Sequence, residues 1–296
     1  MPSTLWPLRG VWITLPATAG AAASAAIVGF DDASRWVAAG LLFASWGAGT
    51  VAVLAPRPVG LTLLRAIAPA YALLAIAALV AGETDGLEGW AGVVVTVAAA
   101  FLASTSDVAR AAANAVAYGN EERFPLRVPP ALFLGPLPLV RVVVVAAAAA
   151  GPLLLADSEV RWGVVALVVG VPTVVWGARA LHGLSRRFLV LVPAGVVVVD
   201  PMTLAEPVLF VRRQLRTMRG IDADGPIPRD ALDVRLGASL GTVHIELAEP
   251  VELTSTRRGR RGGVVTRATD LVVAVVARGA FLEAAARRGA AAAGER

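Results

Sequence analysis

The chain contains no cysteine, no lysine and only two histidines among its 296 residues. Without cysteine there can be no disulfide, no thiolate ligand for zinc and no cysteine nucleophile. Because His182 and His244 are the only histidines, a metal site built from several histidines is excluded. No phosphate-binding or dinucleotide-binding glycine motif, calcium loop or spaced Ser–His–Asp set is present. We therefore predict no catalytic residue, no metal site and no cofactor, and we expect a protein that is not an enzyme.

Charge is also scarce, and long apolar runs take its place. Charged residues make up 17% of the chain, hydrophobic residues 57%, and the mean hydropathy is +0.70. A helix needs about 20 predominantly apolar residues to cross a bilayer, and in lipid such a run must be helical. Six stretches meet this requirement: Gly10–Phe30, Trp36–Pro56, Ala66–Gly82, Gly89–Ser106, Leu137–Ala156 and Trp162–Leu181. The sequence predicts a transmembrane domain of six helices over residues 1–183.

Arginines between these runs lie mostly on one side of the predicted membrane. The opposite loops are short and acidic and contain only Arg35 and Arg161. Cytoplasmic loops of membrane proteins are enriched in Lys and Arg. We therefore expect a multi-pass protein of the inner (cell) membrane, in contact with bilayer lipid, with both termini in the cytoplasm. The arginines on the predicted cytoplasmic side are Arg9, Arg57, Arg65, Arg110, Arg123, Arg127, Arg179, Arg186 and Arg187.

Two arginines, Arg65 and Arg141, are the intramembrane candidates for an ion or substrate site, because charge within a span is a pointer to function. Each lies near the cytoplasmic end of its run, so snorkelling to the headgroups is the alternative. No Asp, Glu or His lies in the middle of a span, which weakens a proton-coupled carrier. The small residues of Ala17–Ala26 favour tight packing within one bundle, with a homo-oligomer face as the alternative.

The longest internal loop, Ser106–Pro130, precedes a proline-broken apolar stretch, Ala131–Leu139. Asp107 and Arg110 are one helical turn apart, which favours extension of the fourth helix into the cytoplasm. An interfacial or re-entrant segment is one interpretation of the apolar stretch. We favour the simpler one, in which it is the entry to the fifth helix.

After residue 183 the runs shrink to strand length. Short β-branched runs bounded by Gly, Pro and Asp are typical of hairpins. About seven such runs precede Phe281–Arg288, whose apolar spacing fits one face of a short helix. We predict a small barrel or sandwich closed by that helix. The expected strands are Phe188–Val192, Val196–Val199, Pro207–Arg213, Leu232–Leu236, Val243–Leu247 and Val251–Thr254, with Val264–Thr266 and Leu271–Val276 as the last strand or strands.

The opening hairpin RFLVLVPAGVVVVDP (187–201) and the closing segment FLEAAARRG (281–289) resemble bacterial pleckstrin-homology-like (PH-like) domains. The whole chain is similar to polytopic membrane proteins of actinobacteria that end in such a domain. The resemblance implies a cytoplasmic all-β, seven-stranded, strongly bent sheet or barrel capped by one helix over residues 184–290, followed by a disordered tail, 291–296. It implies a binding or assembly module and no shared catalysis, and it implies no particular ligand.

Arginines form the strongest polar clusters of this predicted domain. They are Arg257, Arg258, Arg260 and Arg261 in one loop, and Arg212, Arg213, Arg216 and Arg219 after a strand. Either set could meet anionic headgroups or a protein partner, and a solvated loop or the wet face of a sheet is the alternative. Nucleic acid is not expected, because no aromatic residues alternate with the arginines. We expect His244 on a solvated strand face.

We therefore predict a non-enzymatic membrane protein whose PH-like domain, residues 184–290, binds a protein partner or anionic lipid at the cytoplasmic face. The alternative is a small-molecule or lipid transporter regulated by that domain. A transporter needs a polar path, so the discriminating feature is whether Arg65, Arg141, Thr96 and Ser104 face a common interior.

Overall fold

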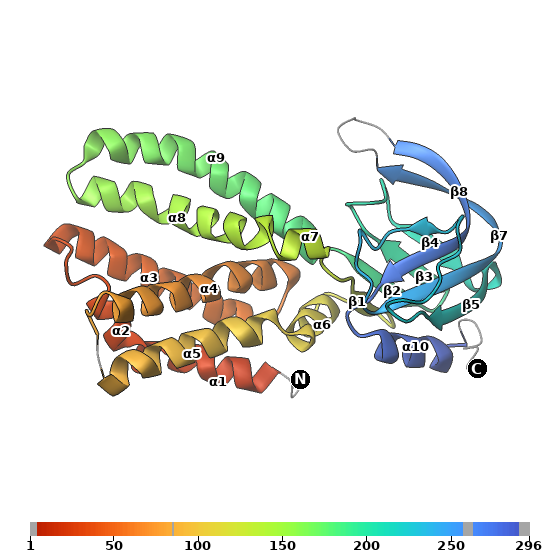
Figure 1. Cartoon of the computed structure of the whole chain (residues 1–296), viewed down its shortest axis with the longest axis horizontal. Coiled ribbons are helices and arrows are strands. Elements are labelled where there is room, and N and C mark those ends of the chain that lie inside the picture. The colour runs from red at the N-terminus through yellow and green to blue at the C-terminus, as the bar shows by residue number, and fades with distance from the viewer. Residues whose placement is uncertain (1–4, 85, 257–262, 290–296) are drawn as a thin grey trace. The chain divides into compact units, whose positions relative to one another are not determined.

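The structure, a computed structural model, describes residues 5–84, 86–256 and 263–289. It divides into two compact units (Figure 1). The helical unit contains the chain up to Ala112 together with Leu137–His182, and the β unit contains Ala113–Pro136 together with the chain from Gly183 onward. The predicted tail, 291–296, and the arginines of 257–261 lie outside the described residues.

Five helices in the described part of the chain are long and apolar enough to cross a membrane. The amide of Ser34 donates to the Asp31 side chain at the start of the first of them, 2.8 Å away, and this hydrogen bond lowers the pKa of Asp31. The five helices are α3 (Asp32–Leu54), α4 (Pro58–Val80), α5 (Gly86–Ser104), α8 (Pro136–Ala156) and α9 (Val160–Ser185).

The first predicted run forms two shorter helices, α1 (Trp6–Thr18) and α2 (Gly20–Ala25), which meet at Ala19. Pro16 lies inside α1. A proline has no amide proton, so it leaves the carbonyl four residues earlier without its helical partner. That carbonyl belongs to Trp12, and the Trp46 indole N–H of α3 donates to it at 2.9 Å. The Trp46 indole therefore supplies the hydrogen bond that Pro16 cannot, and α1 ends two residues later at Thr18.

Residues 113–136, which the sequence analysis left with the membrane domain, belong to the β unit. After α6 (Ser106–Asn114), the Asn114 side-chain amide both donates to the Arg123 carbonyl and accepts from its amide, each at 2.8 Å. These two hydrogen bonds lead the chain into β1 (Glu122–Pro125). This strand pairs with β2 (Phe188–Val192), and its Phe124 is completely buried. A short helix, α7 (Pro130–Phe133), precedes α8.

The described strands form two four-stranded sheets and no closed barrel, which corrects the predicted barrel. The first has the order β1-β2-β3-β4 and is antiparallel. The second has the order β5-β7-β8-β6, with β6 parallel to β8. The remaining strands are β3 (Gly195–Val199), β4 (Val208–Val211), β5 (Leu215–Gly220), β6 (Leu232–Asp233), β7 (Thr242–Thr256) and β8 (Gly263–Ala274).

Several strand predictions need revision. Val243–Leu247 and Val251–Thr254 are one strand, β7, whose pairing with β8 shifts register between Glu246 and Val251. The two runs after residue 263, expected to form one strand or two, form one strand, β8. The expected terminal helix is present as α10 (Arg278–Arg287). Its Phe281 ring packs edge-on against Phe124 of β1 with the centroids 5.3 Å apart, so the inserted segment and the C-terminal helix share one core.

An ion pair lies inside the β unit. Arg187 and Asp200 form two hydrogen bonds of 2.8 Å, and their side chains are 1% and 0% exposed. Arg187 also donates to the carbonyl of Arg127, and the Thr203 hydroxyl donates to Asp200, each at 2.8 Å. Because its hydrogen bonds extend beyond the pair, this buried ion pair joins β2, β3 and the segment after β1.

Replacing Asp200 with Asn should destabilise the β unit by about 3–5 kcal/mol, because removing one partner leaves a buried, unpaired charge. Hydrogen exchange of β2 and β3 peptides in the full-length protein should accelerate about 10²–10⁴-fold. The matched control is Arg267→Gln, which breaks the exposed pair that Arg267 forms with Glu252 and should cost under about 1 kcal/mol. Equal exchange rates in the two variants would show that the buried ion pair stabilises the β unit no more than the exposed pair does.

Candidate functional site

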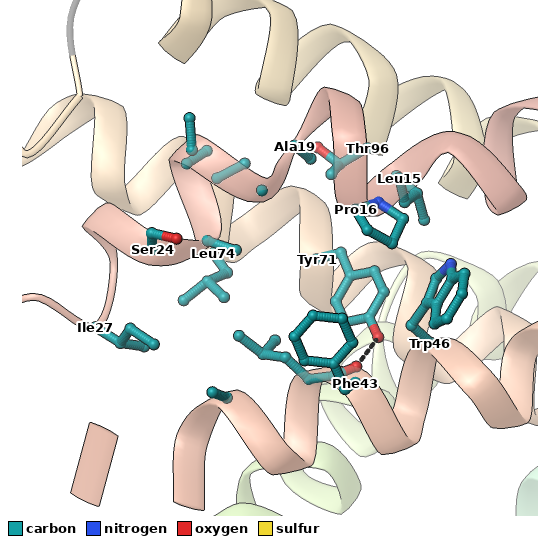
Figure 2. Close-up of a pocket in the computed structure, with 17 residues that line it drawn as sticks. Leu15, Pro16, Ala19, Ser24, Ile27, Phe43, Trp46, Tyr71, Leu74 and Thr96 are labelled. Atoms are coloured by element: carbon teal, nitrogen blue, oxygen red, sulfur yellow. Dashed lines mark hydrogen bonds between the residues drawn. The ribbon is translucent and has the colours of Figure 1, made fainter. Parts of the chain in front are cut away.

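A cavity of about 400 Å³ lies in the helical unit, beside the break between α1 and α2 (Figure 2). Its walls come from α1, α2, α3, α4 and α5. In Figure 2 the rings of Phe43, Tyr71 and Trp46 gather at one end, and Ser24 and Ile27 lie at the other. Most of the lining is apolar: Leu15, Pro16, Ala19–Ala23, Ile27, Ala39, Leu42, Phe43, Trp46, Leu74 and Ala75, with Ser24, Tyr71 and Thr96 as the hydroxyl-bearing residues.

Two tryptophans fix the aromatic end of this cavity. Trp12 and Trp46 each donate the indole N–H to the other's backbone carbonyl, at 3.1 and 2.9 Å. Trp12 is completely buried and stacks on Tyr71 with the ring centroids 5.8 Å apart. Gly49 permits this arrangement, because a Cβ there would lie 2.1 Å from the Trp12 ring. The aromatic wall is therefore held by hydrogen bonds and close packing.

Two of the three hydroxyl groups that line the cavity, those of Tyr71 and Thr96, have backbone partners. Tyr71 donates to the carbonyl of Leu42 at 3.0 Å, drawn in Figure 2, and lies 2.6 Å from the Ser45 hydroxyl. Thr96 donates to the carbonyl of Gly92 at 2.7 Å. Their protons are thus used within the protein, while the oxygen atoms can still accept a hydrogen bond. Such a cavity suits a largely apolar ligand with few polar groups.

Sequence reasoning did not predict this cavity. The stretch Ala17–Ala26 was interpreted through packing alone. Part of it does pack: a Cβ at Gly92 of α5 would lie 2.8 Å from Ala22, which is the close approach of a small-residue contact. Residues 19–24 of the same stretch, Ala22 among them, also line the cavity. The signal that was available is Pro16, because an interrupted membrane helix often marks a binding site.

The intramembrane candidates do not share one interior. Of Arg65, Arg141, Thr96 and Ser104, Thr96 alone lines the cavity in the described structure. Arg65 donates to the carbonyls of Ala103 and Ser104, at 3.2 and 3.5 Å. These carbonyls end α5, where no helical amide can reach them. Arg65 thus has a structural role at the end of α5, which neither the snorkelling nor the transport interpretation predicted.

The described arginines of the β unit differ from one another. Arg212 and Arg213 are exposed and form no ion pair with a described residue. Arg216 pairs with Glu246 at 3.0 Å, so its charge is partly neutralised. Arg219 donates to His244 and is therefore engaged with the sheet. The free positive charge of this set is concentrated at Arg212 and Arg213.

His244 is buried, with 3% exposure, so the prediction of a solvated strand face is wrong. Its Nδ1 accepts from Arg219 Nε at 3.2 Å, and its Nε2 lies 2.6 Å from Asp270. The pattern failed because neighbours on β5 and β8 cover the outward face of β7 at this position. The alternation of apolar and polar residues along one strand does not show whether side chains of neighbouring strands bury its polar face.

Within residues 5–84, 86–256 and 263–289, no group of three or more His, Asp or Glu side chains is placed to hold a metal ion. A scan against protein-family models and searches of curated proteins and of solved structures find no match for the chain. Its function therefore has to be argued from these residues themselves.

Proposed function

We propose that the chain is a non-enzymatic membrane protein that binds the hydrocarbon chain of a lipid or fatty acid in the cavity beside the α1–α2 break. The carrying observation is the cavity itself, which is apolar, of ligand size and built at an interrupted helix. A bilayer supplies this class of ligand at high local concentration. The Tyr71 hydroxyl at one end of the cavity, or that of Ser24 at the other, offers an acceptor for one polar group of the ligand.

We further propose six spans, with α1 and α2 forming one broken crossing and both termini in the cytoplasm. Together they cover Trp6–Ala25, which at 1.5 Å per residue is about 30 Å, the thickness of the hydrocarbon core. The arginine-poor loops before α3, between α4 and α5 and between α8 and α9 support this orientation.

A second function, for the β unit, is favoured by Arg212 and Arg213. We propose that they bind an acidic segment of a cytoplasmic protein, in keeping with a PH-like binding module. The Arg212 amide donates to Ala194, in the turn between β2 and β3, at 2.9 Å. That turn is at the opposite end of β2 from Phe188, where the chain arrives from α9. Their exposure and the absence of an ion pair with a described residue leave both guanidinium groups available to such a segment.

Filling the cavity should exclude its ligand. Full-length protein in liposomes would be photolabelled with a diazirine analogue of palmitic acid, and the adducts mapped by mass spectrometry. We expect wild-type adducts on cavity-lining peptides, and Ala39→Phe should reduce them at least about five-fold because the ring occupies the space. The matched control, Ala44→Phe, places the same ring on the same helix at an exposed residue outside the lining. Labelling that is unchanged by Ala39→Phe would contradict the proposal.

The absence of cysteine makes the topology testable with single introduced thiols. We expect an impermeant maleimide, applied from outside, to label Asp32→Cys, Glu83→Cys and Asp157→Cys. Asn120→Cys and a cysteine added at the N-terminus should be labelled only after permeabilisation. If the N-terminal thiol is labelled together with Asp32→Cys, α1 and α2 do not cross and the six-span proposal is wrong.

For the β unit, fluorescein-labelled deca-glutamate would be titrated against the full-length protein in phosphatidylcholine nanodiscs. Replacing both Arg212 and Arg213 with Gln should weaken binding about ten-fold or more, since charge-assisted contacts are lost. Arg229→Gln with Arg267→Gln removes two exposed charges elsewhere and should change binding little. If both double substitutions weaken binding equally, the effect depends only on the net charge of the protein, and this assignment is overturned.

A further inference from the structure

The two ends of the cavity beside the α1–α2 break differ in the hydrogen bonds of their hydroxyl groups. At the aromatic end, Tyr71 already donates to the Leu42 carbonyl and lies 2.6 Å from the Ser45 hydroxyl. At the other end, the Ser24 hydroxyl forms no hydrogen bond with any residue that the structure describes, and Ser24 is exposed. A free hydroxyl can donate one hydrogen bond and accept others. Of the three hydroxyls that line the cavity, that of Ser24 therefore keeps its proton for a ligand.

The two ends of the cavity also lie at different depths along the helices. Ser24 is the penultimate residue of α2, before the turn that leads into α3 at Asp32. Trp46 lies fourteen residues, or about 21 Å, inside α3 from Asp32. Tyr71 lies nine residues, or about 14 Å, inside α4 from its end at Val80. Because α3 and α4 are consecutive helices that pack together, the start of α3 lies beside the end of α4. The cavity therefore runs from the α2–α3 turn to the middle of the helices.

The lining of the cavity is partly exposed at the surface of the helical unit. Helix α2 packs against α4 and α5, and together with α3 it lines the cavity. The exposed lining residues come from both sides, with Pro16, Ala21 and Ser24 on α1 and α2 and Phe43 on α3. Three of these four side chains are apolar, so the surface around the opening is suited to hydrocarbon. An acyl chain can therefore enter sideways from the bilayer without crossing water.

We propose that the bound lipid or fatty acid lies with its polar end at Ser24 and the end of its chain against Tyr71 and Trp46. This orientation rests on the function proposed above and adds to it the direction of the chain and the residue that binds the polar group. At the α2–α3 turn the polar group bonds to Ser24 and stays near the membrane surface, where water satisfies its other hydrogen bonds.

The opposite orientation is unfavourable for a physical reason. The polar group would then lie about 14 Å or more from the helix ends, beside Tyr71 and Thr96, whose protons are already donated to backbone carbonyls. Burying a polar group without enough hydrogen bonds costs free energy. The apolar end of the chain loses nothing there, because the aromatic wall offers it close packing.

Two palmitic acid analogues test this direction in full-length protein in liposomes. One carries the diazirine next to the carboxyl group, and the other carries it next to the terminal methyl group. We expect the carboxyl-side probe to label peptides around Ser24 and Ile27, and the methyl-side probe to label those around Trp46 and Tyr71. The reverse pattern, or equal labelling of both ends by both probes, overturns the orientation and leaves the proposed function standing. If neither probe labels the cavity, the proposed function is contradicted and the orientation is overturned with it.

Ser24→Ala tests the residue that binds the polar end, because it removes a hydroxyl that has no hydrogen bond within the described protein to lose. The mole fraction of carboxyl-side probe needed for half-maximal labelling should rise about two- to ten-fold, the effect of losing one hydrogen bond. Ser24→Thr keeps the hydroxyl and should bind more tightly than Ser24→Ala. The matched control, Thr18→Ala, removes an exposed hydroxyl outside the lining and should label as wild type does. If Ser24→Ala also labels as wild type does, or if Thr18→Ala weakens labelling equally, the proposal is overturned.

Discussion

Backbone carbonyls without an amide partner are the constraint around which much of this molecule is organised. In lipid an unsatisfied carbonyl costs several kcal/mol, and every helix ends with carbonyls that its own amides cannot reach. The chain meets this need with arginine, whose fork of five N–H groups can serve two acceptors at once. Arginines that each donate to two carbonyls are Arg9, Arg35, Arg65, Arg187 and Arg288.

Arginines that bond to backbone carbonyls have a structural role, which distinguishes them from arginines without such a partner. Arg9 and Arg65 complete the ends of α3 and α5, so their presence near the membrane needs no transported ion. In the β unit, Arg187 likewise donates to two backbone carbonyls, and it also bonds to Asp200. Arg212 and Arg213 have no such partner among the described residues, and both are exposed.

Local patterns predicted the elements well where one run makes one element. The apolar runs matched by α3, α4, α5, α8 and α9, and the strands β2 and β3, are contiguous in sequence. The insertion of residues 113–136 into the β unit could not be predicted in this way, since the pairing of β1 with β2 joins residues more than 60 apart. The burial of His244 was missed for a similar reason: its cover comes from Arg219 and Asp270 on other strands.

At the candidate site, the loss of one helical hydrogen bond is coupled to the placement of an aromatic side chain. Pro16 removes the amide that would have bonded to the Trp12 carbonyl, and Trp46 must come close to replace it. That approach fixes the aromatic wall of the cavity, whose lining also includes residues of α2, α4 and α5. Sequence alone shows the proline, but the carbonyl it frees and the indole that replaces its amide come from helices 34 residues apart. The hydrogen bond that replaces the missing amide therefore also places an aromatic side chain in the wall of an apolar cavity.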